Sequence, residues 1–152
     1  MTNVPSTGAG RTDFGPFFAD MFAITGSIRY VAVGRGQGIA MQQRVGVDVA
    51  SSDVSNRFEE LLVNPTLLTL ATQRGDLDCG GLRHVIIGYG YFNACVLPIP
   101  GGHVCVSFEV DSDPWRASTP SGGPSSAIWR WPAVWRGRRA LVPLGWMAHR
   151  DR

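Results

Sequence analysis

Two stretches with strand patterns, residues 28–45 and 82–110, lie on either side of one helical segment, and this order limits the possible folds more than any other feature. In the first stretch, an apolar run rich in β-branched residues (28–33) is joined by a turn with three glycines to a run with one apolar face and one polar face (39–45). Such a turn is typical of a β-hairpin, because glycine adopts the positive φ angles that hairpin turns need. A phosphate-binding loop would instead need a helix directly after the glycines. We therefore predict strands at 28–33 and 39–45.

The second stretch predicts three strands, near 82–88, 91–98 and 103–110, separated by turns rich in glycine and proline. Along the last of them, apolar and polar residues alternate, which is the period of a strand with one apolar face. A short apolar helix precedes the hairpin and is expected to end at Gly26. The order helix, two strands, helix, three strands predicts an α+β domain with a five-stranded antiparallel sheet.

The central helical segment contains a proline in its middle. It is rich in leucine and is expected to begin at an N-cap, Asn56, and to end at Gly75. Proline lacks the backbone N–H and clashes with the preceding turn, so a helix breaks or bends where it occurs. We therefore predict two short helices joined by a hinge at Pro65, with Asn64 capping the second.

The composition changes sharply near residue 114. Residues 1–114 hold seven arginines and eleven acidic residues, whereas residues 115–152 hold seven arginines, one acidic residue and all five tryptophans. A high content of proline, glycine and serine favours a disordered appendage. We predict a flexible lead at 1–13, one α/β domain at 14–113, and a disordered or non-native tail at 114–152. Binding of nucleic acid or of an anionic membrane by the tail is the alternative, and no nucleic-acid partner is expected.

The chain shows no sign of a membrane span or a leader. Its apolar runs fall short of the roughly 20 residues that a span needs, and the N-terminus is polar. Three cysteines without paired spacing do not predict a disulfide framework. We expect a cytoplasmic protein with reduced thiols.

Three segments together resemble a known family. They are the hairpin YVAVGRGQGIAMQQR, the helix NRFEELLVNPTLLTLATQRG and the meander LRHVIIGYGYFNACVLPIPGGHVCVSFEV. Their order, over about residues 16–110, resembles the roadblock (dynein light chain-type) branch of the roadblock/longin fold, a profilin-like sandwich. The resemblance implies a non-enzymatic module that scaffolds or regulates small GTPases or motors. Pro65 and the lack of a third helix depart from that family's pattern.

The same resemblance implies a homodimer. In roadblock-like dimers the second helices pack together, and an edge strand extends the sheet from one subunit to the other. An exposed apolar edge strand is a liability that two-fold pairing removes. The interface would then involve eight side chains: Phe58, Leu61, Leu62, Leu68, Arg74, Arg83, Val85 and Ile87. We expect a second copy of the chain and a small GTPase as partners, and no cofactor.

Cys79 is the candidate for a different class of protein, a small cysteine-dependent enzyme or a redox or ligand sensor. It follows Asp78, and His84 lies five residues further on. A catalytic cysteine needs a base within hydrogen-bond distance, with a third group to orient that base. The neighbouring carboxylate of Asp78 would raise the thiol pKa rather than lower it. We therefore predict a small buried cysteine that packs against a glycine turn.

A metal site was the other chemical alternative. His103 and Cys105 lie on the same face of the last strand, and Cys95 lies on the strand before it. Closed zinc sites need about four ligands, so we predict no metal site here.

Overall fold

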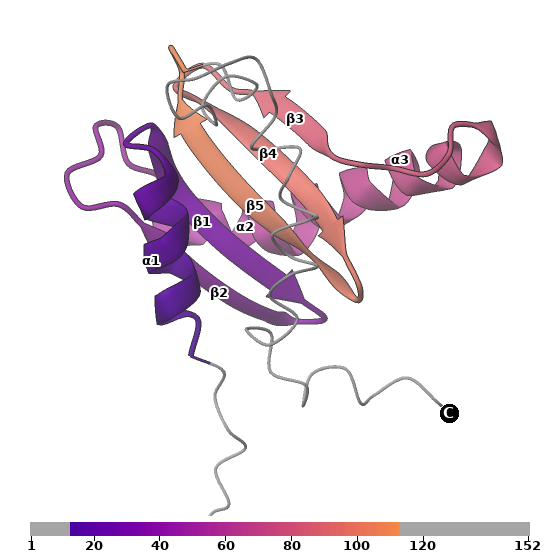
Figure 1. Ribbon diagram of the computed structural model, residues 1–152, viewed down its shortest axis with the longest axis horizontal. Helices are drawn as coiled ribbons and strands as arrows, with labels where there is room; N and C mark the ends of the chain where they lie inside the picture. Colours follow the sequence, from indigo (N-terminus) through magenta and orange to yellow (C-terminus); the bar gives the residue numbers. More distant parts are fainter. Residues whose placement is uncertain (1–12, 113–152) are drawn as a thin grey trace, which may run out of the picture.

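Residues 13–112 are described by the computed structural model, and they place helices on both faces of one sheet (Figure 1). The predicted flexible lead lies outside these residues except for Asp13, and the predicted tail lies outside them entirely. The elements are α1 (Gly15–Ile24), β1 (Ile28–Arg35), β2 (Gly38–Gln43), α2 (Asp53–Phe58), η1 (Glu59–Val63), α3 (Asn64–Asp78), β3 (Val85–Gly88), β4 (Phe92–Ile99) and β5 (Gly102–Glu109). The predicted α+β class with a five-stranded antiparallel sheet is confirmed.

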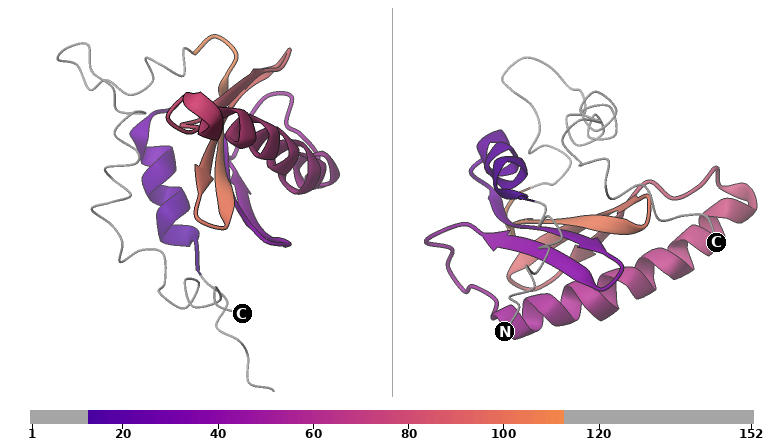
Figure 2. Two further views of the ribbon diagram at one scale, coloured as in Figure 1. Left: turned by 90° about the vertical axis from the view of Figure 1, so that its right-hand side faces the viewer. Right: turned by 90° about the horizontal axis from the view of Figure 1, so that it is seen from below.

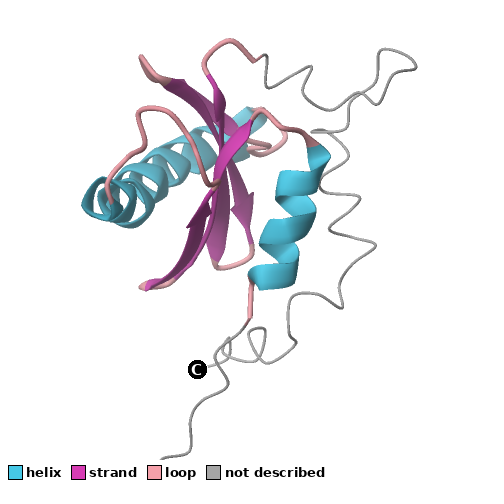
Figure 3. Ribbon diagram, turned by 90° about the vertical axis from the view of Figure 1, so that its left-hand side faces the viewer, coloured by secondary structure: helices cyan, strands magenta, loops and turns pink. Residues whose placement is uncertain are grey.

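The strands lie in the order β2-β1-β5-β4-β3, so β5 is central and β2 and β3 are the edges. In the register of β5, Val104 lies opposite Val33 of β1, and Val106 lies opposite Cys95 of β4. The sheet has helices on both faces, with α1 on one and the helix that follows β2 on the other (Figure 3). Both faces of β5 are therefore buried, including the side with polar residues, where His103 is only 3% exposed.

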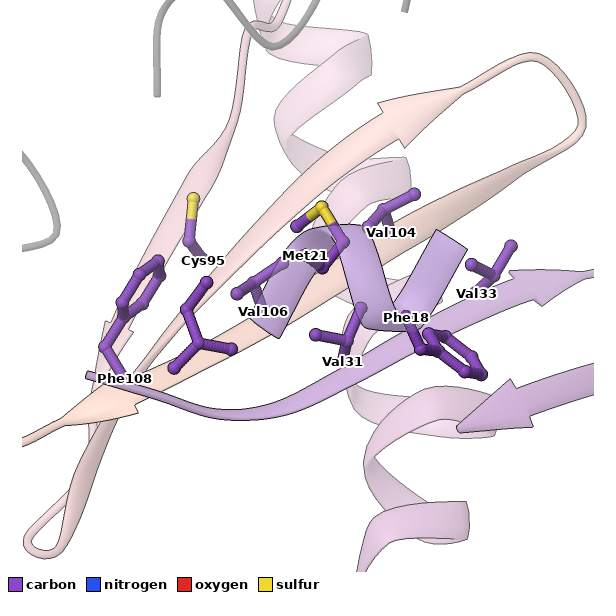
Figure 4. Close-up of a cluster of buried hydrophobic side chains, with 9 residues drawn as sticks. Phe18, Met21, Val31, Val33, Cys95, Val104, Val106 and Phe108 are labelled. Atoms are coloured by element: carbon purple, nitrogen blue, oxygen red, sulfur yellow. The ribbon is translucent and has the colours of Figure 1, made fainter. Parts of the chain in front are cut away.

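Two apolar clusters fill the space between the sheet and its helices. On the α1 side, Phe18 and Met21 pack over the central strands (Figure 4). The strand members of this cluster are Ile28, Val31, Val33, Cys95, Val104, Val106 and Phe108. On the opposite side the cluster is smaller, and the second helix contributes one buried apolar side chain to it, Leu68. The α1 side thus holds the larger part of the apolar core.

The predicted break at Pro65 is wrong, because α2, η1 and α3 follow one another without a gap and form one long helix (residues 53–78). The five-residue segment η1 is a π-helical turn, in which the N–H of Asn64 donates to the carbonyl of Glu59. π-turns are wider than α-turns and occur as single turns inside α-helices. The wider turn directly before Pro65 gives its ring the room that a regular α-turn denies it.

Both ends of the long helix also differ from the prediction. Its N-cap is Ser52, whose hydroxyl accepts from the N–H of Ser55, and Asn56 lies inside the helix. The helix continues past Gly75 to Asp78, and the Gly75 carbonyl accepts from the N–H groups of Cys79 and Gly81. Gly75 is needed for close packing, since a Cβ there would lie 2.9 Å from the carbonyl carbon of Gly81.

The length of the long helix raises the question of whether it could cross a membrane. Across residues 13–112, no helix combines the length and the apolar character that crossing a bilayer requires.

Candidate functional site

The long helix has an inverted pattern: polar side chains take central positions on its buried side, while most of its large apolar side chains are exposed. Glu60 and Asn64 are 1% and 0% exposed and face the sheet, and Leu68 is the buried apolar side chain one turn further on. A helix that covers a sheet normally turns its apolar stripe inward. The outward leucines of this helix are therefore not explained by the core of the described domain.

Glu60 is the centre of the polar contacts on the inner side. Its Oε2 lies 2.6 Å from Nε2 of His103 on β5 and accepts from Asn64 Nδ2 at 3.1 Å. Its Oε1 accepts from the hydroxyl of Tyr30 on β1 at 3.2 Å. We call Glu60, Asn64, Tyr30 and His103 the Glu60 cluster. The cluster ties the π-turn of the helix to the two central strands.

The electrostatics of the cluster follow from burial around one carboxylate. Burial raises the pKa of the Tyr30 hydroxyl, and the nearby Glu60 raises it further. The thiol pKa of Cys105 is also raised well above its usual value, by burial first and then by Glu60. Both groups are therefore neutral at physiological pH. The polar atom closest to the Glu60 carboxylate is Nε2 of His103. The amide oxygen of Asn64, Oδ1, is buried and has no hydrogen-bond partner among the described residues.

The ring of His103 lies directly against the backbone of Gly34 on β1. The two residues are register partners, and a Cβ at position 34 would lie 2.5 Å from the His103 Cε1 atom. No side chain fits at that distance unless the ring moves, and the ring is held by Glu60. The close approach fixes the geometry of the whole cluster.

Gly34→Ala is expected to lower the free energy of unfolding by about 1–3 kcal/mol, the usual cost of overpacking. Urea unfolding followed by circular dichroism measures this loss. Gly90→Ala is the matched control, because a Cβ at position 90 meets nothing within 4 Å. If the two variants were equally stable, the His103 ring would not be held against Gly34.

Among the described residues, His103, Cys105 and Cys95 do not come together as a metal site. His103 and Cys105 both face the long helix, whereas Cys95 lies in the cluster on the α1 side. Within residues 13–112, no three His, Cys, Asp or Glu side chains are arranged to hold a metal ion.

Cys79 is exposed, so the prediction of a buried cysteine is wrong. Because the long helix continues past Gly75, Cys79 falls at its exposed end. Its Sγ lies 3.1 Å from Nη1 of Arg74 and donates to Oδ1 of Asp78 at 3.3 Å, and these two side chains also form an ion pair. His84 is partly buried, and its pKa is lowered by burial and by Arg83. The thiol of Cys79 thus lies beside the exposed ion pair of Arg74 and Asp78.

Exposed apolar side chains cover the outward side of the long helix, and we call them the outer face. They are Val54, Phe58, Leu61, Leu62, Leu67, Leu70 and Leu77. Phe58 is 59% exposed, Leu62 is 55% exposed and Leu70 is 62% exposed, values far from those of a core. The long helix is an outermost layer of the domain, with the sheet on one side only (Figure 2).

The predicted interface residues divide between this surface and the core. Phe58, Leu61 and Leu62 belong to the outer face, and Arg74 is exposed on the same helix. Leu68 is only 8% exposed and packs against the sheet, which removes it from any surface.

The remaining predicted interface residues lie on or beside β3. Arg83 precedes this strand and is exposed. Val85 and Ile87 lie within the strand and are partly buried against the apolar cluster between the sheet and the long helix. In the described part of the chain, β3 pairs with β4 alone, so its second edge is open. The C-terminal end of α3 extends past this edge (Figure 1). The C-terminal end of the long helix therefore lies beside the open edge of β3.

Comparison with protein-family models and with curated proteins finds no match for this sequence. The geometry of the long helix and of β3 is therefore the basis for a functional proposal.

Proposed function

We propose that this chain is a non-enzymatic protein-interaction module that forms a homodimer through the outer face and the open edge of β3. The observation that supports the proposal most is the inverted helix. Seven apolar side chains are exposed along a helix whose inner side is held to the sheet by a buried carboxylate. Large continuous apolar patches on a domain surface usually mark interaction sites.

The available apolar surface is of the right size for a weak dimer. Fully burying a leucine or phenylalanine side chain contributes about 1.5–3 kcal/mol relative to leaving it exposed. Seven partly exposed side chains thus supply a favourable term of the same order as the roughly 4–15 kcal/mol lost on association. Because the two terms nearly cancel, we expect no more than a weak dimer.

The open edge of β3 gives the dimer its second contact. An unpaired strand edge presents free backbone donors and acceptors that another chain can pair with. A two-fold axis beside β3 would join two such edges and bring the two overhanging helix ends together.

The element order extends the proposal to a second partner. It is the order of roadblock-like domains, which scaffold or regulate small GTPases. A small GTPase bound to the homodimer is therefore part of the proposed function, and this part is supported by the resemblance alone.

The mass of the full chain in solution tests the homodimer. Light scattering from about 1 to about 200 µM spans the range of weak dimers. The expected mass rises from that of one chain, 16.4 kDa, to twice that value over this range. A mass that stays at one chain up to the highest concentration would contradict the homodimer.

A further inference from the structure

We propose that residues 115–152 of the same chain bind across the outer face in the monomer and compete there with the second copy. The inference rests on the proposed function, because it describes the regulation of the same surface. On this proposal the outer face binds a segment of its own chain, and the segment binds through its aromatic side chains and its positive charge. The monomer would then be the covered form, and the dimer would form when the segment leaves.

Charge complementarity supports this occupant over an unrelated protein. Residues 13–112 carry ten acidic residues and six arginines, whereas residues 113–152 carry seven arginines and two acidic residues. On the long helix, the exposed arginines are Arg57 and Arg74, and Arg74 is paired with Asp78, so that Asp53 at the start and Asp76 near the end remain as exposed carboxylates. A basic segment that runs along the helix would pair with both ends. Opposite net charges also raise the rate of encounter.

The segment carries the kind of side chains that bind an apolar helix face. All five tryptophans of the chain lie in it, and three of them, Trp129, Trp131 and Trp135, lie within seven residues. Tryptophan and arginine dominate the binding energy of protein interfaces. A cluster of leucines around Phe58 offers the apolar surface that such side chains bury.

The place where the described chain ends also suits this contact. β5 leads to residue 112, and Ser107 near its end lines one small cavity together with Asn56 of α2. The described chain therefore ends near the first turns of the long helix, with Ser112 accepting from Asn93 beside Phe92 of the same cavity. An extended chain spans about 3.3 Å per residue, so the residues between Ser112 and Trp129 can span about 50 Å. The long helix, at about 1.5 Å per residue, is only about 40 Å long.

Tethering makes weak binding effective. A segment on a short linker meets its site at an effective concentration of about 1 mM, far above the concentration of a second copy. If the segment covers the outer face in two molecules of three, each subunit is competent for only a third of the time. The apparent dissociation constant of the dimer then rises about tenfold, because both subunits must be uncovered.

Tryptophan fluorescence of the full chain tests the contact directly, because residues 13–112 contain no tryptophan and all emission comes from the segment. The measurement is made at about 1 µM, below the expected dimer range. We expect an emission maximum shifted to the blue of that in concentrated urea, and reduced quenching by acrylamide. Leu62→Asp should move both readings toward the urea values, whereas Val45→Asp, a change at a loop residue that is 98% exposed, should not.

The second readout is the dimer itself. With Trp129, Trp131 and Trp135 all changed to alanine, the full chain should dimerise about tenfold more tightly. Emission that is the same in the wild-type chain and in Leu62→Asp would overturn the proposal, even if the dimer forms. A blue shift that appears only where the mass doubles would place the segment on the second copy and would also overturn it. If the shift is present at low concentration but no chain ever dimerises, the homodimer fails and the contact stands.

Discussion

Glu60→Ala is expected to lower the free energy of unfolding by about 3 kcal/mol or more, because it leaves three buried polar groups without their shared partner at a cost of at least about 1 kcal/mol each. The substitution takes the acceptor away from three buried donors: the His103 ring, the Tyr30 hydroxyl and the Asn64 amide. Bulk solvent has little access to these groups, since all three residues are at most 6% exposed. Urea unfolding followed by circular dichroism measures the loss.

Two further variants separate the role of the cluster from the mere loss of a carboxylate. Asp76→Ala removes an exposed carboxylate from the same helix and should change stability by less than about 0.5 kcal/mol. Glu60→Gln keeps one oxygen acceptor and a similar volume, so its cost should lie between those of the other two variants. A Glu60→Ala chain as stable as Asp76→Ala would show that the cluster does not hold the long helix to the sheet.

In the chain with Trp129, Trp131 and Trp135 changed to alanine, Leu62→Asp is expected to weaken the dimer by at least about 30-fold, the effect of losing a central anchor worth about 2 kcal/mol and leaving a charge at the interface. Leu62 lies on the outer face and is 55% exposed in the described domain. Its replacement should therefore change the free energy of unfolding of the monomer by less than about 0.5 kcal/mol. Sedimentation equilibrium gives the dissociation constant, and urea unfolding at low concentration gives the stability.

Val45→Asp is the control for the outer face, because Val45 is almost fully exposed but lies in the loop after β2. It introduces the same charge at a distance from the long helix. The account predicts an unchanged dissociation constant for this variant. If Leu62→Asp and Val45→Asp weakened the dimer equally, the added charge alone would explain the effect. The outer face would then not be the dimer interface.

The strand pattern of the sequence was enough to predict the sheet. The glycines at 34, 36 and 38 and the alternation in 103–110 fixed the hairpin and the last strand, and the observed β1, β2 and β5 lie within two residues of their predicted bounds. Local residue types determine such elements, because hairpin turns and period-two alternation involve neighbours in the sequence. The burial of the polar side of β5 was not visible, because it depends on a helix far away in the chain.

The continuity of the long helix could not be predicted from Pro65. Proline in a regular α-helix costs about 3 kcal/mol, which favours a break. The structure avoids the break with a π-turn at Glu59–Val63, and no simple sequence signal marks such a turn. The missed continuity also explains the error at Cys79, because a helix that ended at Gly75 would have placed this cysteine in a packed turn.

The inverted orientation of the helix is the other feature that sequence pattern did not reveal. The leucines gave an apolar stripe, and periodicity alone assigns such a stripe to the core. Only Leu68 of that stripe is buried, while Glu60 and Asn64 take the inner positions. A signal was present in the spacing of these two polar residues, four apart and therefore on one side of a helix. This spacing indicates a buried polar cluster only when His103 and Tyr30 are known to lie opposite this side of the helix.

Hydroxyl-radical footprinting of the full chain with Trp129, Trp131 and Trp135 changed to alanine tests most directly whether a second copy covers the outer face, because residues 115–152 should then leave that face open in the monomer. The side chains of Phe58, Leu62 and Leu70 are reactive when exposed, and Val45 provides an internal reference outside the surface. The account predicts that all three are oxidised more slowly at about 200 µM than at about 1 µM, where dimers are scarce, while Val45 reacts equally at both. Equal oxidation of the three side chains at the two concentrations would contradict the account.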